Sequence, residues 1–175
     1  MKVALSDSMS LTAAYFDSEQ VRAERDNDTG ETSEIRGLTV DGFEVELKGR
    51  VNDGLNLAIA YSDLSGETSS GGIPREIPEH TLSAFAAWEV NEKLSVALGL
   101  TQQGESKIKD NNAGLVLPEY TRIDVSAYYQ VAPNLSLQMN VENLMDELYF
   151  PHSHSTHQAS VGESVNSRVS LRWTY

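Results

Sequence analysis

The sequence predicts an all-β fold, an antiparallel meander of about nine strands. The first observation behind this prediction is that apolar residues recur at every second position along much of the chain, which is typical of strands with one apolar and one polar face. The second is that the segments between these runs alternate between short turns and long polar stretches. No segment shows a helical period of comparable strength, so helices are not expected.

Each expected strand is identified by apolar residues at alternating positions. The clearest is segment 135–142, where the four odd-numbered residues are apolar and the four even-numbered residues are polar. Eight of the strands are assigned, in chain order, to 9–16, 43–47, 55–61, 82–88, 94–100, 123–129, 135–142 and 169–175. Their apolar residues are, in the same order, Leu11, Ala13 and Tyr15; Phe43, Val45 and Leu47; Leu55, Leu57, Ile59 and Tyr61; Leu82, Ala84, Ala86 and Trp88; Leu94, Val96, Leu98 and Leu100; Ile123, Val125, Ala127 and Tyr129; Leu135, Leu137, Met139 and Val141; and Val169, Leu171, Trp173 and Tyr175.

The connections between the expected strands alternate in length. Short turns, with residues such as Asn, Asp, Gly or Pro, fall at 6–8, 51–54, 91–93 and 132–134. Long polar stretches run roughly over 17–36, 65–80, 105–119 and 146–163. One edge of the sheet therefore has tight turns and the other has long loops. This asymmetry is typical of transmembrane outer-membrane β-barrels, which have short periplasmic turns and long extracellular loops.

The apolar face of the expected strands is uncharged, and its aromatic residues gather near strand ends. Charged residues such as Glu44, Asp124 and Arg172 fall on the opposite face. A membrane barrel carries aromatic girdles at both membrane surfaces, whereas a soluble sandwich has no reason to sort its aromatic residues by strand end. The expected membrane-interface residues are Tyr15 and Tyr61 near the long-loop edge, and Trp88, Tyr129, Trp173 and Tyr175 near the short-turn edge.

The composition excludes several classes of function. Lys and Arg number 13 against 26 Asp and Glu, a net charge of −13, so the chain lacks the basic face that nucleic-acid binding requires. Without cysteine it can form no disulfide, cysteine-ligated zinc site or thiol nucleophile. No apolar run approaches the roughly 20 residues of a membrane-spanning helix. The first residues lack the apolar core of a signal peptide, so we expect a cytosolic chain or one without its true amino terminus.

Three sets of motifs occur in a fixed order along the chain. The first is RGLTVDGFEVELKGR at 36–50, followed by a turn and an apolar strand, and the second is IPEHTLS at 77–83. The third and most specific set is LPEYTRID at 117–124, VENLMDELYF at 141–150 and RWTY at 172–175. In order and separation these segments resemble the carboxy-terminal part of the β-barrel of TonB-dependent outer-membrane receptors of the ferric-siderophore type.

This resemblance implies a function and a place in a larger protein. Intact receptors of the family have a 22-stranded barrel with a plugged lumen, and residues 1–175 would be the carboxy-terminal portion of that barrel, without the plug domain. The chain would then be part of a receptor for TonB-dependent uptake of a ferric siderophore or similar metal chelate. It would not be an enzyme and would need no cofactor. The implied location is the outer membrane of a Gram-negative bacterium.

The resemblance also implies a set of partners. These are outer-membrane lipid, the ferric siderophore or metal chelate, and the TonB complex, which would act through the plug region. The barrel-assembly machinery is a further implied partner, because receptors of this family end in a strand that carries its recognition signal. Here that signal corresponds to Leu171, Trp173 and Tyr175, with tyrosine in the last position where phenylalanine is commoner.

One cluster in the last long stretch could bind a metal ion or haem. His152, His154 and His157 supply imidazole, a good ligand for zinc, copper, nickel and iron. Their spacing does not place all three on one face of a strand, so a flexible loop would have to wrap the ion. The alternative is an ordinary polar surface loop. No catalytic motif such as G-x-S-x-G occurs, and no catalytic residue is expected.

Two other interpretations of the whole chain stay open at this point. One is a complete eight-stranded outer-membrane barrel with a structural or adhesion role, since small barrels of that size occur. The other is a soluble, secreted β-sandwich, whose strands would alternate in the same way.

Overall fold

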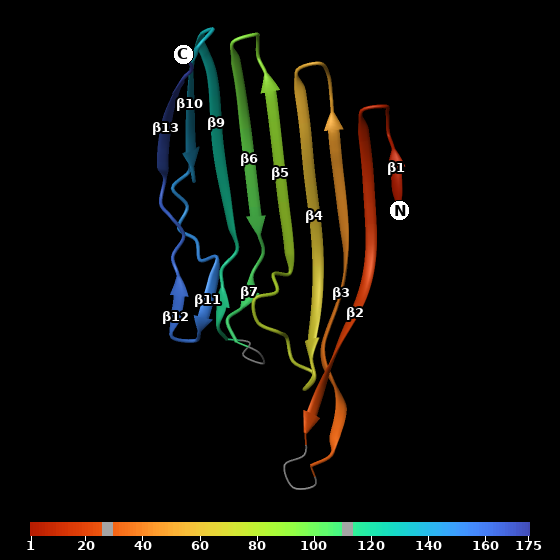
Figure 1. Cartoon of the computed structure of the whole chain (residues 1–175). Helices are drawn as coiled ribbons and strands as arrows, with labels where there is room; N and C mark the ends of the chain where they lie inside the picture. The colour runs from red at the N-terminus through yellow and green to blue at the C-terminus, as the bar shows by residue number, and fades with distance from the viewer. Residues whose placement is uncertain (26–29, 110–113) are drawn as a thin grey trace.

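The computed structural model describes residues 1–25, 30–109 and 114–175, and the fold within these ranges is one large open sheet with two small hairpins (Figure 1). The hairpins are β7 (Ser106–Lys107) with β8 (Val116–Leu117), and β11 (His152–Ser155) with β12 (Gln158–Ser160). The large sheet has nine antiparallel strands, in the spatial order β1 (Lys2–Ala4), β2 (Met9–Arg25), β3 (Thr32–Arg50), β4 (Leu55–Thr68), β5 (His80–Glu89), β6 (Leu94–Gln103), β9 (Tyr120–Ala132), β10 (Leu135–Glu142) and β13 (Asn166–Trp173).

This architecture confirms the predicted all-β fold, an antiparallel meander of about nine strands, and the short β1 is the strand of the large sheet that the sequence did not assign. None of the described residues forms a helix, and so none of them forms one that could cross a membrane. Within the described ranges the sheet ends at β1 on one side and β13 on the other, and no closed barrel is formed. The odd strand number disfavours the alternative of a complete eight-stranded barrel, because bacterial single-chain barrels have an even number of strands.

The short turns lie together at one end of the sheet, as predicted (Figure 1). Two of them are fixed by asparagine side chains. Asn52 Oδ1 accepts hydrogen bonds from the backbone N–H groups of Gly54 and Leu55 at 3.0 and 2.9 Å, and Asn91 makes the same arrangement in the next turn at this end. These side chains accept hydrogen bonds from turn N–H groups that do not pair with a neighbouring strand. The turns therefore lie where the sequence predicted them.

The opposite end of the sheet differs from the prediction. β2 and β3 stay paired out to Arg25 and Thr32, so the expected loop over 17–36 is wrong for most of its length, while residues 26–29 lie outside the described ranges. Residues 17–25 and 32–36 contain few apolar residues and no sustained apolar alternation, and yet backbone pairing continues through them. The loop expected over 65–80 also starts later, because β4 continues to Thr68.

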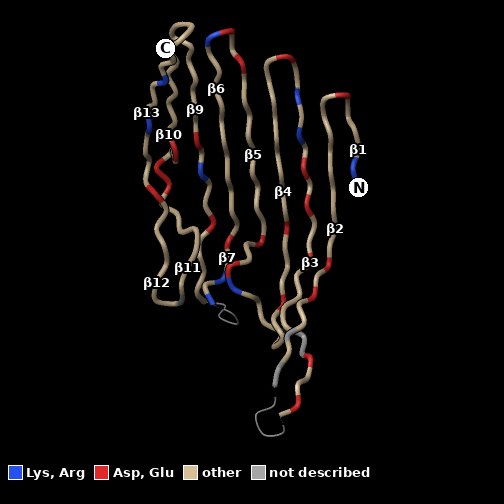
Figure 2. Tube along the Cα trace, viewed as in Figure 1, with Lys and Arg blue, Asp and Glu red and all other residues tan. Residues whose placement is uncertain are grey.

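The two faces of the sheet differ in character along its middle. Apolar side chains at alternate positions form one face, and small or polar side chains form the other. Figure 2 shows that β5 and β6 are free of charged residues along most of their length, whereas charges gather near both ends of the sheet. Other strands carry charges along their length: Glu44, Glu46 and Lys48 line the polar face of β3, and Arg168 and Arg172 lie on β13.

The apolar face of the sheet is not covered by any other element among the described residues. Val169, Leu171 and Trp173 on β13 are 63%, 67% and 67% exposed. The few buried side chains, such as Leu117 and Tyr149, lie instead beside the long connections. A sandwich buries its apolar face between two sheets, and the described residues contain no second large sheet, so the soluble-sandwich alternative is wrong.

Candidate functional site

Two motif segments meet at the long-loop end of the sheet and form a network of polar groups. Arg122 and Asp124 alternate with apolar residues on β9, so both side chains lie on the polar face. The Arg122 guanidinium donates to Asp124 Oδ2 from Nε at 3.2 Å and from Nη2 at 2.8 Å. Its Nη1 donates to the hydroxyl oxygen of Tyr149 at 3.2 Å. The guanidinium therefore joins β9 to the connection that follows β10.

Asn143 is the most deeply buried member of this network, at 1% exposure. It follows β10 with a left-handed backbone (φ 50°), a conformation that asparagine tolerates better than most residues. Its backbone N–H donates to Asp124 Oδ1 at 2.9 Å. Its side chain donates to the carbonyls of Glu147 and Glu163 and accepts from the Glu147 N–H, each at 2.9 Å. Asn143 thus holds the turn after β10 against the segment that leads into β13.

Tyr149 packs its ring into the same region. The centroids of the Tyr149 and Tyr120 rings lie 4.7 Å apart, and the Arg122 guanidinium carbon lies 6.0 Å from the Tyr149 ring centroid. The ring also lies against Gly162, whose N–H donates to the Tyr149 carbonyl at 2.8 Å. A Cβ atom at position 162 would overlap this ring, so only glycine allows the approach. The network therefore fixes the base of the loop that carries β11 and β12.

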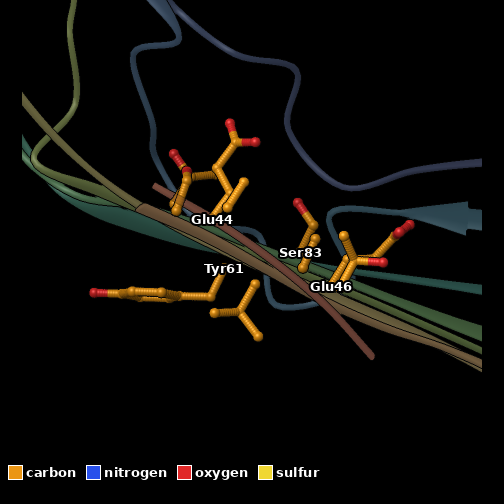
Figure 3. A pocket seen from close by; sticks show the side chains of 10 residues that line it. Glu44, Glu46, Tyr61 and Ser83 are labelled. Carbon is orange, nitrogen blue, oxygen red and sulfur yellow. The ribbon is translucent and has the colours of Figure 1, made fainter. Parts of the chain in front are cut away.

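The polar face of the sheet also carries a shallow hollow over β2 to β5. Its volume is about 340 Å³. Figure 3 shows Glu44, Glu46 and Ser83 on this side of the sheet and Tyr61 on the other. Lys48 Nζ pairs with Glu46 Oε2 at 2.8 Å. The carboxylates and hydroxyl groups of the hollow can accept hydrogen bonds from a molecule or a protein segment that lies against this face.

Five of the predicted interface residues lie on the apolar face, at two different levels, and the sixth, Tyr175, lies beyond the end of β13. Trp88 and Tyr129 are about half exposed near the short-turn end, where Trp88 lies opposite Leu55 in the ladder. Tyr15 and Tyr61 lie within β2 and β4 rather than at their ends, since both strands extend farther than predicted. Their contact with a membrane surface stays a prediction.

The structure does not gather the three predicted metal-binding histidines into a site. His152 and His154 lie on β11, where the ring of His152 is 3.0 Å from Ser160 Oγ across the hairpin. His157 lies in the turn between β11 and β12. Across the described ranges, no group of three or more His, Asp or Glu side chains is placed to hold a metal ion. Metal binding by this hairpin stays a prediction.

The predicted assembly signal lies on the last strand and just beyond it. Leu171 is opposite Leu137, and Trp173 is opposite Leu135 in the ladder between β10 and β13. Both side chains are largely exposed on the apolar face, and Tyr175 follows the end of the strand. These residues are therefore accessible at the edge of the sheet that β13 forms.

A family model described as "TonB dependent receptor-like, beta-barrel" matches residues 3–144. The chain belongs to this family. The match covers β2 to β6, β9 and β10, and it ends just after Asn143. The motif resemblance seen in the sequence is thereby confirmed, and the nine-stranded sheet is part of a TonB-dependent receptor-like barrel domain.

Several receptors of the family are similar to this chain over nearly its whole length. The probable TonB-dependent siderophore receptor PiuA of Acinetobacter baumannii is 26% identical over 98% of the chain, and its crystal structure matches with a TM-score of 0.82 at 25% identity over 99% of the chain. The metal-pseudopaline receptor CntO of Pseudomonas aeruginosa is 27% identical over 95%. The structure of the ferripyoverdine receptor of the Pseudomonas aeruginosa outer membrane, bound to ferripyoverdine, matches with a TM-score of 0.77 at 25% identity over 94%.

The chain spans about a quarter of the length of these relatives. It covers 25% of PiuA and of CntO in the sequence comparison, and 27% and 25% of the PiuA and ferripyoverdine-receptor chains in the structure comparison. The names of these relatives describe receptors for siderophores or metal chelates, and none describes an enzyme.

Sequence reasoning missed two features of the polar face. Phe85 lies there opposite Gly99, and is 52% exposed; its position out of phase with the apolar residues of β5 was the available signal. The pairing of Arg122 with Tyr149 was also missed, although both residues belong to motifs that the sequence identified. Their positions in the two motifs gave no indication that the side chains meet.

Proposed function

We propose that this chain forms part of the barrel wall and the external loops of an outer-membrane receptor that imports a ferric siderophore or similar metal chelate by a TonB-dependent process. The observation that carries the proposal is the similarity to siderophore and metal-chelate receptors along nearly the whole chain, at matching fold. The exposed apolar face of the sheet supports it, because such a face needs a lipid environment or a partner.

In this proposal the nine strands are the carboxy-terminal portion of a larger closed barrel. The open edges at β1 and β13 would pair with further strands, since an unpaired edge exposes backbone N–H and C=O groups. The polar face would line the lumen, and the plug domain and its contact with TonB would come from other parts of the protein. Binding and release of a chelate need no covalent step, so we assign no catalytic residue.

The proposal predicts that the tryptophans of the short-turn end contact lipid headgroups. We expect that lipids brominated near the headgroup quench the fluorescence of Trp88 and Trp173 more strongly than lipids brominated at the chain ends, because indole rings prefer the interface. The signal is the difference between the wild-type protein and a Trp88→Phe/Trp173→Phe variant in vesicles. Equal quenching by both lipids, or none, would contradict the interfacial placement.

The terminal aromatic residue is expected to direct assembly. Replacing Tyr175 by alanine should lower the amount of folded receptor in the outer membrane several-fold, because the assembly machinery would lose its terminal recognition residue. Heat-modifiable migration on gels measures the folded fraction, and immunoblots of whole cells check that both variants are synthesised in equal amounts. Thr174→Ala, one position earlier on the polar face, is the matched control and should assemble normally; equal assembly of both variants would exclude a role for Tyr175.

The histidine hairpin gives a separate prediction. If His152, His154 and His157 bind a metal, replacing all three by alanine should remove one Zn²⁺ or Ni²⁺ site in calorimetric titration, because imidazole supplies the ligands. His80→Ala changes the fourth histidine of the chain and serves as the control. Unchanged titration of the triple variant would show that the hairpin is an ordinary polar loop.

The import function itself is tested by uptake of radiolabelled iron. Iron-starved Gram-negative cells without their own siderophore receptors would express the full-length protein and receive ferric catecholate, pyoverdine and hydroxamate chelates in turn. We expect saturable uptake of at least one chelate, and its loss in a strain without TonB. Uptake of none of them, or uptake that persists without TonB, would contradict the proposal.

A further inference from the structure

Glu76 contacts two other long connections from its position in the connection between β4 and β5. Its backbone N–H donates to the carbonyl of Lys107 at 2.8 Å, in the connection that follows β6. Its carboxylate Oε1 accepts from Ser153 of β11, from the backbone N–H at 2.7 Å and from Oγ at 3.3 Å. One residue therefore joins the three connections that follow β4, β6 and β10.

The hydrogen bond from the Ser153 N–H to Glu76 is strong because the donor is buried and the acceptor is charged. Ser153 is 2% exposed, so its backbone N–H has no access to bulk water. A buried N–H without a partner is costly, and a hydrogen bond to a charged acceptor is stronger than one to a neutral acceptor. The neighbouring Arg75 adds a second link, because its guanidinium pairs with Glu76 Oε2 at 3.5 Å and donates to the His154 carbonyl at 3.5 Å.

The backbone at Glu76 is held in a conformation that glutamate seldom adopts. Its φ angle of 56° lies in the left-handed region, where a Cβ atom is unfavourable. Residues keep such a conformation when the surrounding structure over-determines it. Here the backbone N–H of Glu76 bonds to Lys107 while its carboxylate bonds to Ser153. The left-handed conformation allows both contacts at the same time.

The connection that carries Glu76 is itself seated on the sheet. Pro74 is buried, and a Cβ atom at Gly66 would meet Pro74 Cγ at 2.6 Å, so the connection folds back closely onto β4. The Leu64 N–H donates to the Glu79 carbonyl at 3.0 Å, and the Glu79 N–H donates to the Glu105 carbonyl at 3.2 Å. Glu76 thus extends from a fixed base toward the hairpin β11-β12.

We propose that Glu76 is a positioning residue that fastens the hairpin β11-β12 to the connections following β4 and β6, so that the three connections behave as one rigid body. The proposal concerns how the three connections are held together; that they are external loops of a receptor rests on the proposed function. The hairpin carries His152, His154 and His157, and its placement at the long-loop end of the sheet (Figure 1) would depend on a carboxylate far away in the sequence.

The proposal is tested by distance measurement between spin labels. The chain contains no cysteine, so the exposed residues Ser69 and Thr156 would be replaced by cysteine and labelled in the full-length protein in outer membranes. With Glu76 intact we expect one narrow distance peak. Glu76→Ala should lose that peak and give a broad distribution, while Glu79→Ala, an equal change of charge nearby, should keep it.

Two further variants separate the carboxylate from the backbone. Glu76→Gln keeps an oxygen that can accept from Ser153 and should restore the narrow peak, whereas Glu76→Gly relieves the left-handed backbone and should still lose it. A narrow peak in Glu76→Ala or Glu76→Gly, in protein whose heat-modifiable migration shows correct assembly, would overturn the proposal. The measurement needs no chelate, so its result tests the role of Glu76 independently of the import function.

Discussion

Replacing Asn143 by alanine is expected to lower the free energy of unfolding by about 4 kcal/mol. The variant leaves the Glu147 N–H and the Glu147 and Glu163 carbonyls without their partner, around a residue that is itself 1% exposed. Each buried group without a partner costs about 1–3 kcal/mol, and alanine is also less suited than asparagine to the left-handed backbone. Urea unfolding of the full-length protein in detergent measures the loss.

Two variants make this result specific. Asn143→Asp keeps the acceptor oxygen but loses both Nδ2 donor bonds, so it should fall between wild type and Asn143→Ala. Asn140→Ala removes a partly exposed asparagine of β10, whose Oδ1 accepts from Ser126 Oγ at 2.9 Å, and should cost about 1 kcal/mol or less. Equal stability of the Asn140 and Asn143 alanine variants would show that the buried network contributes nothing particular.

Adding one methyl group at Gly162 is expected to have a comparable effect. A Cβ atom there overlaps the Tyr149 ring, and the ring has little freedom to move because it packs against the Tyr120 ring and its hydroxyl accepts a hydrogen bond from Arg122. Overpacking of this kind costs about 3 kcal/mol. We expect Gly162→Ala to unfold at a correspondingly lower urea concentration and to loosen the segment leading into β13.

A double-mutant cycle identifies the ring as the cause. Tyr149→Ala alone should destabilise by about 3–5 kcal/mol through lost packing. In that background Gly162→Ala should cost less than about 1 kcal/mol, because the atoms it would overlap are gone. Additive costs of the two substitutions would mean that the glycine is needed for another reason, such as its own backbone conformation.

The sequence was sufficient to predict the sheet wherever one face is apolar. Alternation through segments 94–100 and 135–142 placed both strands on the correct face, and Asn52 and Asn91 marked the turns that end their strands. The prediction failed for 17–25 and 32–36, where the hairpin of β2 and β3 continues without a sustained apolar alternation. Pairing there rests on backbone hydrogen bonds, which leave no period in the sequence.

The candidate site was predictable in its motifs but not in its contacts. The motifs at 117–124 and 141–150 include Arg122 and Tyr149, yet their bond joins residues 27 positions apart and depends on the register of two strands. Glu76 and Ser153 are 77 positions apart and belong to no motif. Contacts between distant loops depend on the three-dimensional path of the chain, which neither local periodicity nor motif spacing records.

The apolar face of this sheet is expected to meet lipid while the polar face lines the lumen of a barrel. Single cysteines along β6 test this placement directly, since the chain has none of its own. In outer membranes of cells that express the full-length protein, cysteines at Leu98 and Leu100 should react with a lipid-soluble maleimide and resist a charged one. Cysteines at Ala97 and Thr101 should show the reverse preference. Uniform reaction of all four positions with the charged reagent would contradict a lipid-facing sheet and the receptor assignment built on it.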